Sequence, residues 1–233
     1  MPRFLHLLPC FLLAACASDP YAPPVDEASV KEGINDNFLA EDVDVDQWVA
    51  RFENSERREI ARNRDAIVQA LDLAPGMDIA DIGAGTGLFL EPFVGAAGPE
   101  GKVWAVDISP GMVEHLDARI AEAGWDNAAA LLCTEKSAEL PEASVDLVFI
   151  CDTYHHFEYP MHTVASLRKA VRPGGRVAIV EFVRDPDNEW VMNHVRCSQA
   201  DVIAEMEAAG FRFLGEREVP GLEENYLVFF ERR

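Results

Sequence analysis

Apolar and polar positions follow two alternating periods from residue 75 to the end of the chain. Short apolar runs typical of buried strands are followed by longer segments in which apolar residues recur at helical spacing. The runs predict strands at 77–82, 103–106, 128–133, 145–151, 176–182, 211–215 and 226–231. Helical spacing predicts helices at 88–97, 110–123, 160–171 and 198–209. This alternation indicates right-handed βαβ units on a mainly parallel sheet, within one domain over residues 75–233.

The pattern before this domain is helical but shorter. Trp48, Phe52, Ile60 and Ile67 fall at spacings that can share one helix face, and Pro75-Gly76 ends the segment. We therefore expect a helical cap over residues 46–74.

The first residues form a different kind of segment. An apolar run of about a dozen residues is too short to span a bilayer and suits the core of a signal peptide. It ends in Leu13-Ala-Ala-Cys16, which resembles the lipobox of bacterial lipoproteins, in which the cysteine carries the lipid. This resemblance implies a signal peptide over 1–15 and lipidation at Cys16. It also implies a place in the cell envelope, on the periplasmic face of the outer membrane because Ala17 and Ser18, the two residues after Cys16, are not aspartate.

Two other interpretations of the N-terminus stay open. One is an ordinary signal peptide, and the other is a cytoplasmic enzyme whose true start lies after Cys16. Residues 16–45 are acidic and contain three prolines, which predicts a tether between the lipid and the folded part.

Composition and charge favour a single α/β domain and argue against nucleic-acid binding. With 233 residues, 49% apolar and 26% charged, the chain suits one sizeable α/β domain. Its formal net charge of −21 argues against nucleic acid, which is bound mainly through Lys and Arg. The sequence does not indicate an oligomeric state.

Residues 81–87, Asp-Ile-Gly-Ala-Gly-Thr-Gly, lie between a predicted strand and a predicted helix. Glycines at such a turn let a ligand approach the backbone, and the helix offers free amides. Asp107 ends the next strand, where a carboxylate can accept both hydroxyls of a ribose. The spacing of the glycines and the lack of a Tyr-x-x-x-Lys pair disfavour a dinucleotide oxidoreductase. Asp81 suits a cationic ligand better than a pyrophosphate.

The set of motifs resembles class I S-adenosylmethionine-dependent methyltransferases, in particular the small-molecule branch that includes the ubiquinone and menaquinone C-methyltransferases. The segments that carry it are 81–87, 106–112, 140–148 and 167–175. The resemblance implies a doubly wound seven-stranded sheet of order 3-2-1-4-5-7-6, S-adenosylmethionine as cofactor and a small-molecule acceptor. It places Asp81, Gly83, Ala84, Gly85 and Gly87 around the methionine part, Asp107 on the ribose, and Ile108 and Met112 beside the adenine.

The sequence departs from this family at the adenine edge. Where the family often has Asp-Ala, this chain has Lys136 and Ser137. Either Glu135 or the Ser137 hydroxyl takes over the contact with the adenine amino group, or cofactor affinity is weakened.

The predicted fourth strand is followed by the densest reactive stretch of the chain, residues 151–157. Methyl transfer mainly requires alignment of the acceptor with the sulfonium methyl, and Asp152, Tyr154 or His155 can take or hold the acceptor's proton. The His-His-Phe segment can instead serve packing. Candidate substrate contacts are Glu181, His194 and Arg196. Trp48 and Phe52 either line an apolar acceptor site or pack on the core.

The cysteines outside the signal segment are Cys133, Cys151 and Cys197, with no zinc-type spacing. In the family strand order Cys133 and Cys151 lie three strand spacings apart, which is about 14 Å and too far for a disulfide. Buried, inert thiols are expected rather than a redox or metal site. The class-level alternative to a lipid-anchored methyltransferase is a non-catalytic ligand-binding lipoprotein that retains the fold.

Overall fold

A seven-stranded sheet forms the centre of the computed structural model, which describes residues 19–41, 43–54 and 56–233. The strands are β1 (Ile79–Ile82), β2 (Val103–Asp107), β3 (Ala128–Leu132), β4 (Val145–Cys151), β5 (Val171–Phe182), β6 (Phe211–Glu216) and β7 (Asn225–Arg232). Their order is β3-β2-β1-β4-β5-β7-β6, with β7 antiparallel to both neighbours and the other pairs parallel. The predicted class, order and strands are confirmed, and each predicted strand boundary lies within a few residues of its observed position except at the start of β5.

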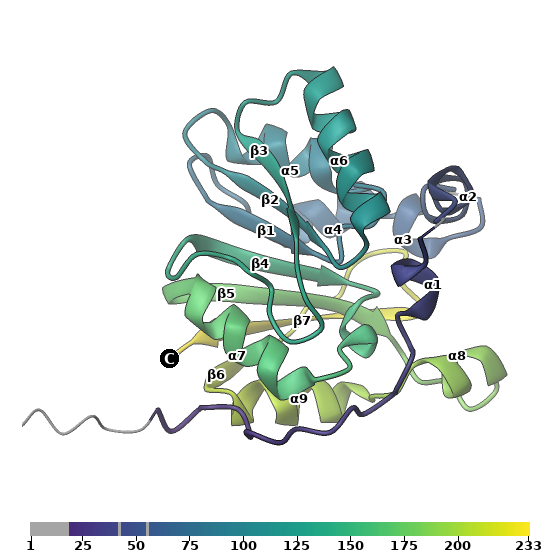
Figure 1. Cartoon of the computed structure of the whole chain (residues 1–233), viewed down its shortest axis with the longest axis vertical. Coiled ribbons are helices and arrows are strands. Elements are labelled where there is room, and N and C mark those ends of the chain that lie inside the picture. The colour runs from purple at the N-terminus through teal and green to yellow at the C-terminus, as the bar shows by residue number, and fades with distance from the viewer. Residues whose placement is uncertain (1–18, 42, 55) are drawn as a thin grey trace, which may run out of the picture.

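Helices cover both faces of the sheet (Figure 1). One apolar core joins the sheet to α4 (Arg64–Ala70), α5 (Leu90–Ala97) and α6 (Pro110–Ala123), and the other joins it to α7 (Pro160–Ala170) and α9 (Gln199–Ala208). Helix α6 begins as its sequence predicts, because the Ser109 side chain accepts a hydrogen bond from the Met112 N–H and Pro110 occupies the first helical position. It ends at the left-handed Gly124.

The cap over residues 46–74 is helical but not one helix. It consists of α2 (Val45–Phe52), α3 (Glu59–Arg62) and α4. The Glu59 carboxylate accepts hydrogen bonds from the backbone N–H groups of Glu223 and Glu224, and Asn63 donates to the Gly221 carbonyl. These contacts hold α3 against the loop between β6 and β7, which is why the helical pattern is interrupted.

The described part of the expected tether lies along the folded domain instead of extending away from it. Figure 1 shows it, in dark purple, running beneath α7 and α9 before it rises to α1 (Asp36–Leu39) and α2. The Glu27 carboxylate accepts hydrogen bonds from the N–H groups of Met161 and His162 in the first turn of α7. Farther along, the Val30 N–H donates to the Glu158 carbonyl. The acidic residues of this segment are thus partly used to dock it, an outcome that composition does not reveal.

The expected signal peptide and Cys16 lie outside the described residues. Among the residues that are described, no helix is both long enough and apolar enough to cross a membrane.

Candidate active site

A cavity of about 810 Å³ opens at the carboxyl ends of β1, β2 and β4. The strand register aligns Ile82 with Val106 and with Ile150, so the loops that follow these strands meet above the sheet. Ligands of doubly wound folds bind at this edge. The N-terminal elements α1, α2 and α3 and the short helix α8 (Glu189–His194) also contribute to the wall.

The glycine loop contributes Gly83, Ala84 and Gly85 to the cavity wall, as expected. All three glycines of the loop have positive φ, between +54° and +85°. Gly87 differs from the expectation because it is not part of the wall. A Cβ atom there would lie 2.9 Å from Leu116 of α6, so this glycine allows close packing of α6 on the loop.

Two carboxylates of the loop region face the cavity, as expected. Asp107 accepts hydrogen bonds from the N–H groups of Gly85 and Ser109, at 2.8 and 2.9 Å. The Asp81 carboxylate has no recorded hydrogen-bond partner within the described parts of the chain. Burial, together with the nearby charge of Asp107, raises the pKa of Asp81 to about 8.

The residues expected at the adenine edge all lie close to the cavity, but not all of them line it. Glu135 and Ser137 line the cavity, and so do Ile108 and Met112. Lys136 is not in the wall, because its ammonium lies 4.2 Å from the centre of the Tyr159 ring, in cation–π contact. Where this chain departs from the family's usual sequence, two polar side chains therefore line the cavity and the lysine contacts Tyr159 instead.

Asp152 lies in the wall, and both of its carboxylate oxygens accept hydrogen bonds from other side chains. Its Oδ2 accepts a hydrogen bond from Arg58 at 2.8 Å, and its Oδ1 accepts one from the Asn225 amide at 2.7 Å. Asp152 also has a left-handed backbone, with φ of 47°, which is uncommon outside glycine. Burial raises the pKa of Asp152, and the Arg58 guanidinium opposes that shift. The pair fixes α3 over the end of β4.

His155 follows in the short 3₁₀ helix η1 (Tyr154–His156) and faces the cavity. Its Nδ1 lies 2.9 Å from both carboxylate oxygens of Glu181, which also accepts hydrogen bonds from the backbone N–H groups of His155 and Phe182. Glu181, a candidate substrate contact, is fully buried and not in the wall. It positions His155 instead.

Tyr154 and Arg196 also lie away from the cavity, contrary to expectation. The Tyr154 hydroxyl donates to the Glu205 carboxylate of α9 at 2.8 Å, and Arg196 forms two hydrogen bonds with the same carboxylate. Burial raises the pKa of Tyr154 well above its ordinary value. Because η1 turns tightly, Tyr154 points into the core beneath α9 while the two histidines after it point to the cavity. The buried network holds α9 on the sheet.

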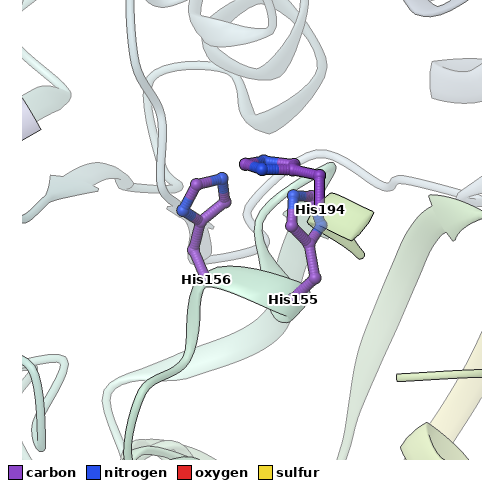
Figure 2. A group of neighbouring side chains, drawn as sticks. All are labelled: His155, His156 and His194. Carbon is purple, nitrogen blue, oxygen red and sulfur yellow. The ribbon is translucent and has the colours of Figure 1, made fainter. Parts of the chain in front are cut away.

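His194 lies in the wall as expected, and His156 joins it there. Figure 2 shows the rings of His155, His156 and His194 turned toward one another. Burial and the neighbouring histidines lower the pKa of His156 to about 2 and that of His194 to about 4. These two rings are neutral at pH 7.

Aromatic side chains from distant segments complete the wall. Trp48 and Phe52 line the cavity, together with Phe38, Phe182 and Trp190, which were not foreseen. Phe38, Trp48 and Phe52 form a continuous row, with ring centres 4.8 and 5.0 Å apart. In the sequence, the only sign of these wall residues is the spacing of apolar and aromatic positions. Residues that pack in an ordinary core have the same spacing.

The cysteines behave as expected from their burial. Cys133, Cys151 and Cys197 are free thiols. Burial raises the pKa of Cys133 and of Cys197 to about 12, and raises that of Cys151 well above its ordinary value. Since the thiolate is the reactive form, all three thiols are inert near neutral pH.

Comparison with known sequences points to one family. Residues 80–177 match the family model described as "Methyltransferase domain". The chain is 34% identical over 122 residues to the ubiquinone/menaquinone biosynthesis C-methyltransferase UbiE of Burkholderia cenocepacia, an alignment that covers 52% of this chain and 49% of that protein. The chain therefore spans about half the length of the curated relatives that it matches.

Solved structures share the fold. A SAM-dependent methyltransferase from Aquifex aeolicus matches with a TM-score of 0.70 and 24% identity, over 80% of this chain and 98% of that one. A geranyl diphosphate methyltransferase in complex with SAM matches with a TM-score of 0.62 and 16% identity, over 73% of this chain and 85% of that one. S-Adenosylmethionine is the methyl donor of this methyltransferase family. Residues 80–177 are thus similar to a methyltransferase domain, and the sheet has the strand order of the class I methyltransferase fold.

Proposed function

We propose that this chain transfers the methyl group of S-adenosylmethionine to a small molecule that binds in the aromatic half of the cavity. The observation that carries the proposal is that one cavity contains both the glycine loop with its two carboxylates and the aromatic row from α1 and α2. Its volume of about 810 Å³ is near the upper end of the range for small-molecule sites, about 300–1,000 Å³, which suits two ligands side by side.

The residues present fit the cofactor. Asp81 is a buried carboxylate without a recorded hydrogen-bond partner in the described chain, and such a group is costly unless a cation or donor reaches it. The ammonium and sulfonium groups of S-adenosylmethionine would supply that charge. Asp107 keeps lone pairs for ribose hydroxyls beside its two backbone donors, while Glu135 and Ser137 offer polar atoms to the adenine. When bound, the cofactor supplies an electrophilic methyl group.

The acceptor half has its own chemistry. Phe38, Trp48 and Phe52 offer apolar ring faces, which favour an acceptor with an apolar or aromatic body. The curated relatives are named as ubiquinone/menaquinone biosynthesis C-methyltransferases, and that name supports a small-molecule acceptor for this chain. The polar groups on this side of the cavity include His155, His156 and His194.

The task of the protein in such a transfer is mostly alignment. The aromatic row holds the acceptor, the glycine loop holds the cofactor, and α1 to α3 exclude water from the space between them. The ion pair between Arg58 and Asp152 keeps α3 in place over the cavity. A substitution that breaks this ion pair and loosens α3 is expected to lower the rate of methyl transfer more than it lowers the affinity for the cofactor.

Calorimetric titration of the purified chain with S-adenosylmethionine tests the proposal. We expect saturable one-to-one binding that is lost in Asp107→Ala and retained in Glu91→Gln, a surface change outside the cavity. No heat and no thermal shift at millimolar ligand would overturn the methyltransferase proposal. Binding of the cofactor without transfer to any small molecule of an envelope extract would instead support a ligand-binding protein that retains the fold.

We also propose that the chain is anchored to the cell envelope through a lipid on Cys16, with its folded part facing the periplasm. The support is the Leu13-Ala-Ala-Cys16 sequence and the short apolar run before it. Metabolic labelling with a lipid precursor is expected to mark the wild-type chain and not Cys16→Ser. An unlabelled wild-type chain found in the cytosolic fraction would refute the anchor.

A further inference from the structure

Three histidines from two separate elements converge in the cavity. His155 and His156 come from η1, and His194 ends α8, almost forty residues later. One ring nitrogen of each lies within 4.8 Å of the others. The ring centres are 4.4 to 5.2 Å apart, and Figure 2 shows all three rings pointing into one space. Histidines gathered in this way are a recurrent ligand set for metal ions.

In His155 and His156, the ring nitrogen that bonds to a neighbouring residue is Nδ1. His155 uses Nδ1 to bind the Glu181 carboxylate, which directs its Nε2 away from Glu181. Carboxylate–histidine pairs of this kind orient metal ligands and raise their basicity.

His156 is oriented in a similar way by Asn35. The Asn35 amide donates to the His156 carbonyl at 3.1 Å, so its carbonyl oxygen is the atom that faces His156 Nδ1 at 3.2 Å. An acceptor at that place requires Nδ1–H on the ring, which leaves the lone pair on Nε2. The segment that carries Asn35 thus fixes the tautomer that a metal ion needs.

His194 is held from both sides. The Lys31 ammonium donates to the carbonyls of Asn193 and His194, each at 2.7 Å, and fixes the end of α8. The His194 ring stacks on Trp190, with ring centres 4.7 Å apart. The ring is therefore positioned against the cluster by contacts that do not use its polar atoms.

The buried carboxylate of Glu181 also favours a cation nearby. Glu181 is fully buried, and its recorded partners in the described chain are the His155 ring and two backbone N–H groups, with no Lys or Arg. A buried carboxylate is costly without a compensating positive charge. A metal ion on His155 would supply that charge through the ring.

We propose that His155, His156 and His194 bind one divalent transition metal ion of the zinc class. Three neutral imidazoles suit Zn²⁺, Cu²⁺, Ni²⁺ or Fe²⁺, whereas Mg²⁺ and Ca²⁺ prefer oxygen ligands. Nitrogens bound to a tetrahedral ion at about 2.0–2.1 Å lie roughly 3.3 Å apart, so side-chain movements of about 1.5 Å close the site.

The site would have an open position toward the cavity, as metal sites with three protein ligands do. Since the same cavity contains the glycine loop, an oxygen or nitrogen atom of the methyl acceptor can take that position beside the cofactor. This part of the inference rests on the proposed function, whereas binding of the ion does not.

Equilibrium dialysis of the full chain against Zn²⁺ after treatment with a chelator tests the site, with the metal measured by mass spectrometry. We expect one ion per chain, and a loss of affinity of at least a hundredfold in His194→Gln, whose ring is only partly buried. Glu181→Gln is expected to weaken binding tenfold to a hundredfold, the usual effect of a group that orients a ligand. The matched control is His115→Gln, because His115 lies on α6 outside the cavity and away from the segment that carries Lys31 and Asn35.

Substitution with Co²⁺ reports on the open position. Three histidines and one exchangeable ligand predict the visible absorption of four-coordinate cobalt, shifted by azide. No stoichiometric binding, or equal affinity in wild type and His194→Gln, would overturn the site. Bound cobalt whose spectrum azide leaves unchanged would overturn the open position. Titration of the same samples with S-adenosylmethionine separates these outcomes from failure of the proposed function, because cofactor binding uses the glycine loop.

Discussion

Asp81 provides the glycine loop with a carboxylate whose charge changes near neutral pH. Burial and the charge of Asp107 raise its pKa to about 8, so only about one tenth of the free protein carries the charge at pH 7. A cationic cofactor binds the ionised form. Binding at pH 7 must therefore include ionisation of Asp81, at a cost of about 1.4 kcal/mol.

Cofactor affinity should depend on pH through Asp81. The ionisation cost is about 2.7 kcal/mol at pH 6 and about 1.4 kcal/mol at pH 7, so affinity for S-adenosylmethionine should rise roughly ninefold between these values. The sulfonium charge does not titrate over this range, and the α-amino group of the cofactor loses its proton only closer to pH 8. Calorimetry in two buffers of different ionisation enthalpy should show release of about 0.9 proton per cofactor at pH 7.

Asp81→Asn removes both the charge and its titration. At pH 8 we expect a loss of about 2–5 kcal/mol in cofactor affinity, the usual cost of removing one partner of a buried charge pair. The loss should be smaller at pH 6, where the wild type also lacks the charge, and the variant should show no pH dependence between pH 6 and pH 7. Glu91→Gln serves as the control. An affinity independent of pH in the wild type, or no proton release, would refute the reasoning.

Three further predictions concern packing and the adenine edge. Gly83→Ala places a Cβ 2.3 Å from the Thr153 side chain at a φ of +70°, and should destabilise the fold by about 1–3 kcal/mol, partly restored by adding Thr153→Ala. Tyr154→Phe should lower the free energy of unfolding by about 1–3 kcal/mol in denaturant titrations and leave cofactor affinity unchanged; loss of transfer at unchanged stability would contradict its structural role. Lys136→Met should leave affinity for S-adenosylmethionine unchanged in calorimetry, whereas Glu135→Gln should weaken it, and the reverse order would contradict the adenine edge described above.

The sheet and the cofactor loop were predictable because local patterns determine them. Apolar runs, helix caps and the glycine turn lie within short stretches of sequence, and the order of strands follows from the family resemblance. The roles within residues 151–157 were not predictable in the same way. Whether a side chain points to the core or to the cavity depends on the tight turn of η1, which separates Tyr154 from its neighbour His155.

The acceptor side of the cavity was even less accessible to sequence reasoning. Its wall brings together Phe38, Trp48, His156 and Trp190, which are far apart in the chain. Their positions depend on the docking of the N-terminal segment along α7 and α8, through contacts such as the one between Lys31 and the His194 carbonyl. The acidic, proline-containing composition of the N-terminal segment predicts a tether. That part of this segment lines the cavity follows only from the contacts of its individual side chains in the structure.

A crystal structure of the chain soaked with S-adenosylhomocysteine tests the central claim most directly. The account predicts the ribose hydroxyls on Asp107, the amino group beside Asp81, and the sulfur facing the aromatic row of Phe38, Trp48 and Phe52. A ligand bound elsewhere, or a glycine loop that stays empty at saturating ligand, would contradict it.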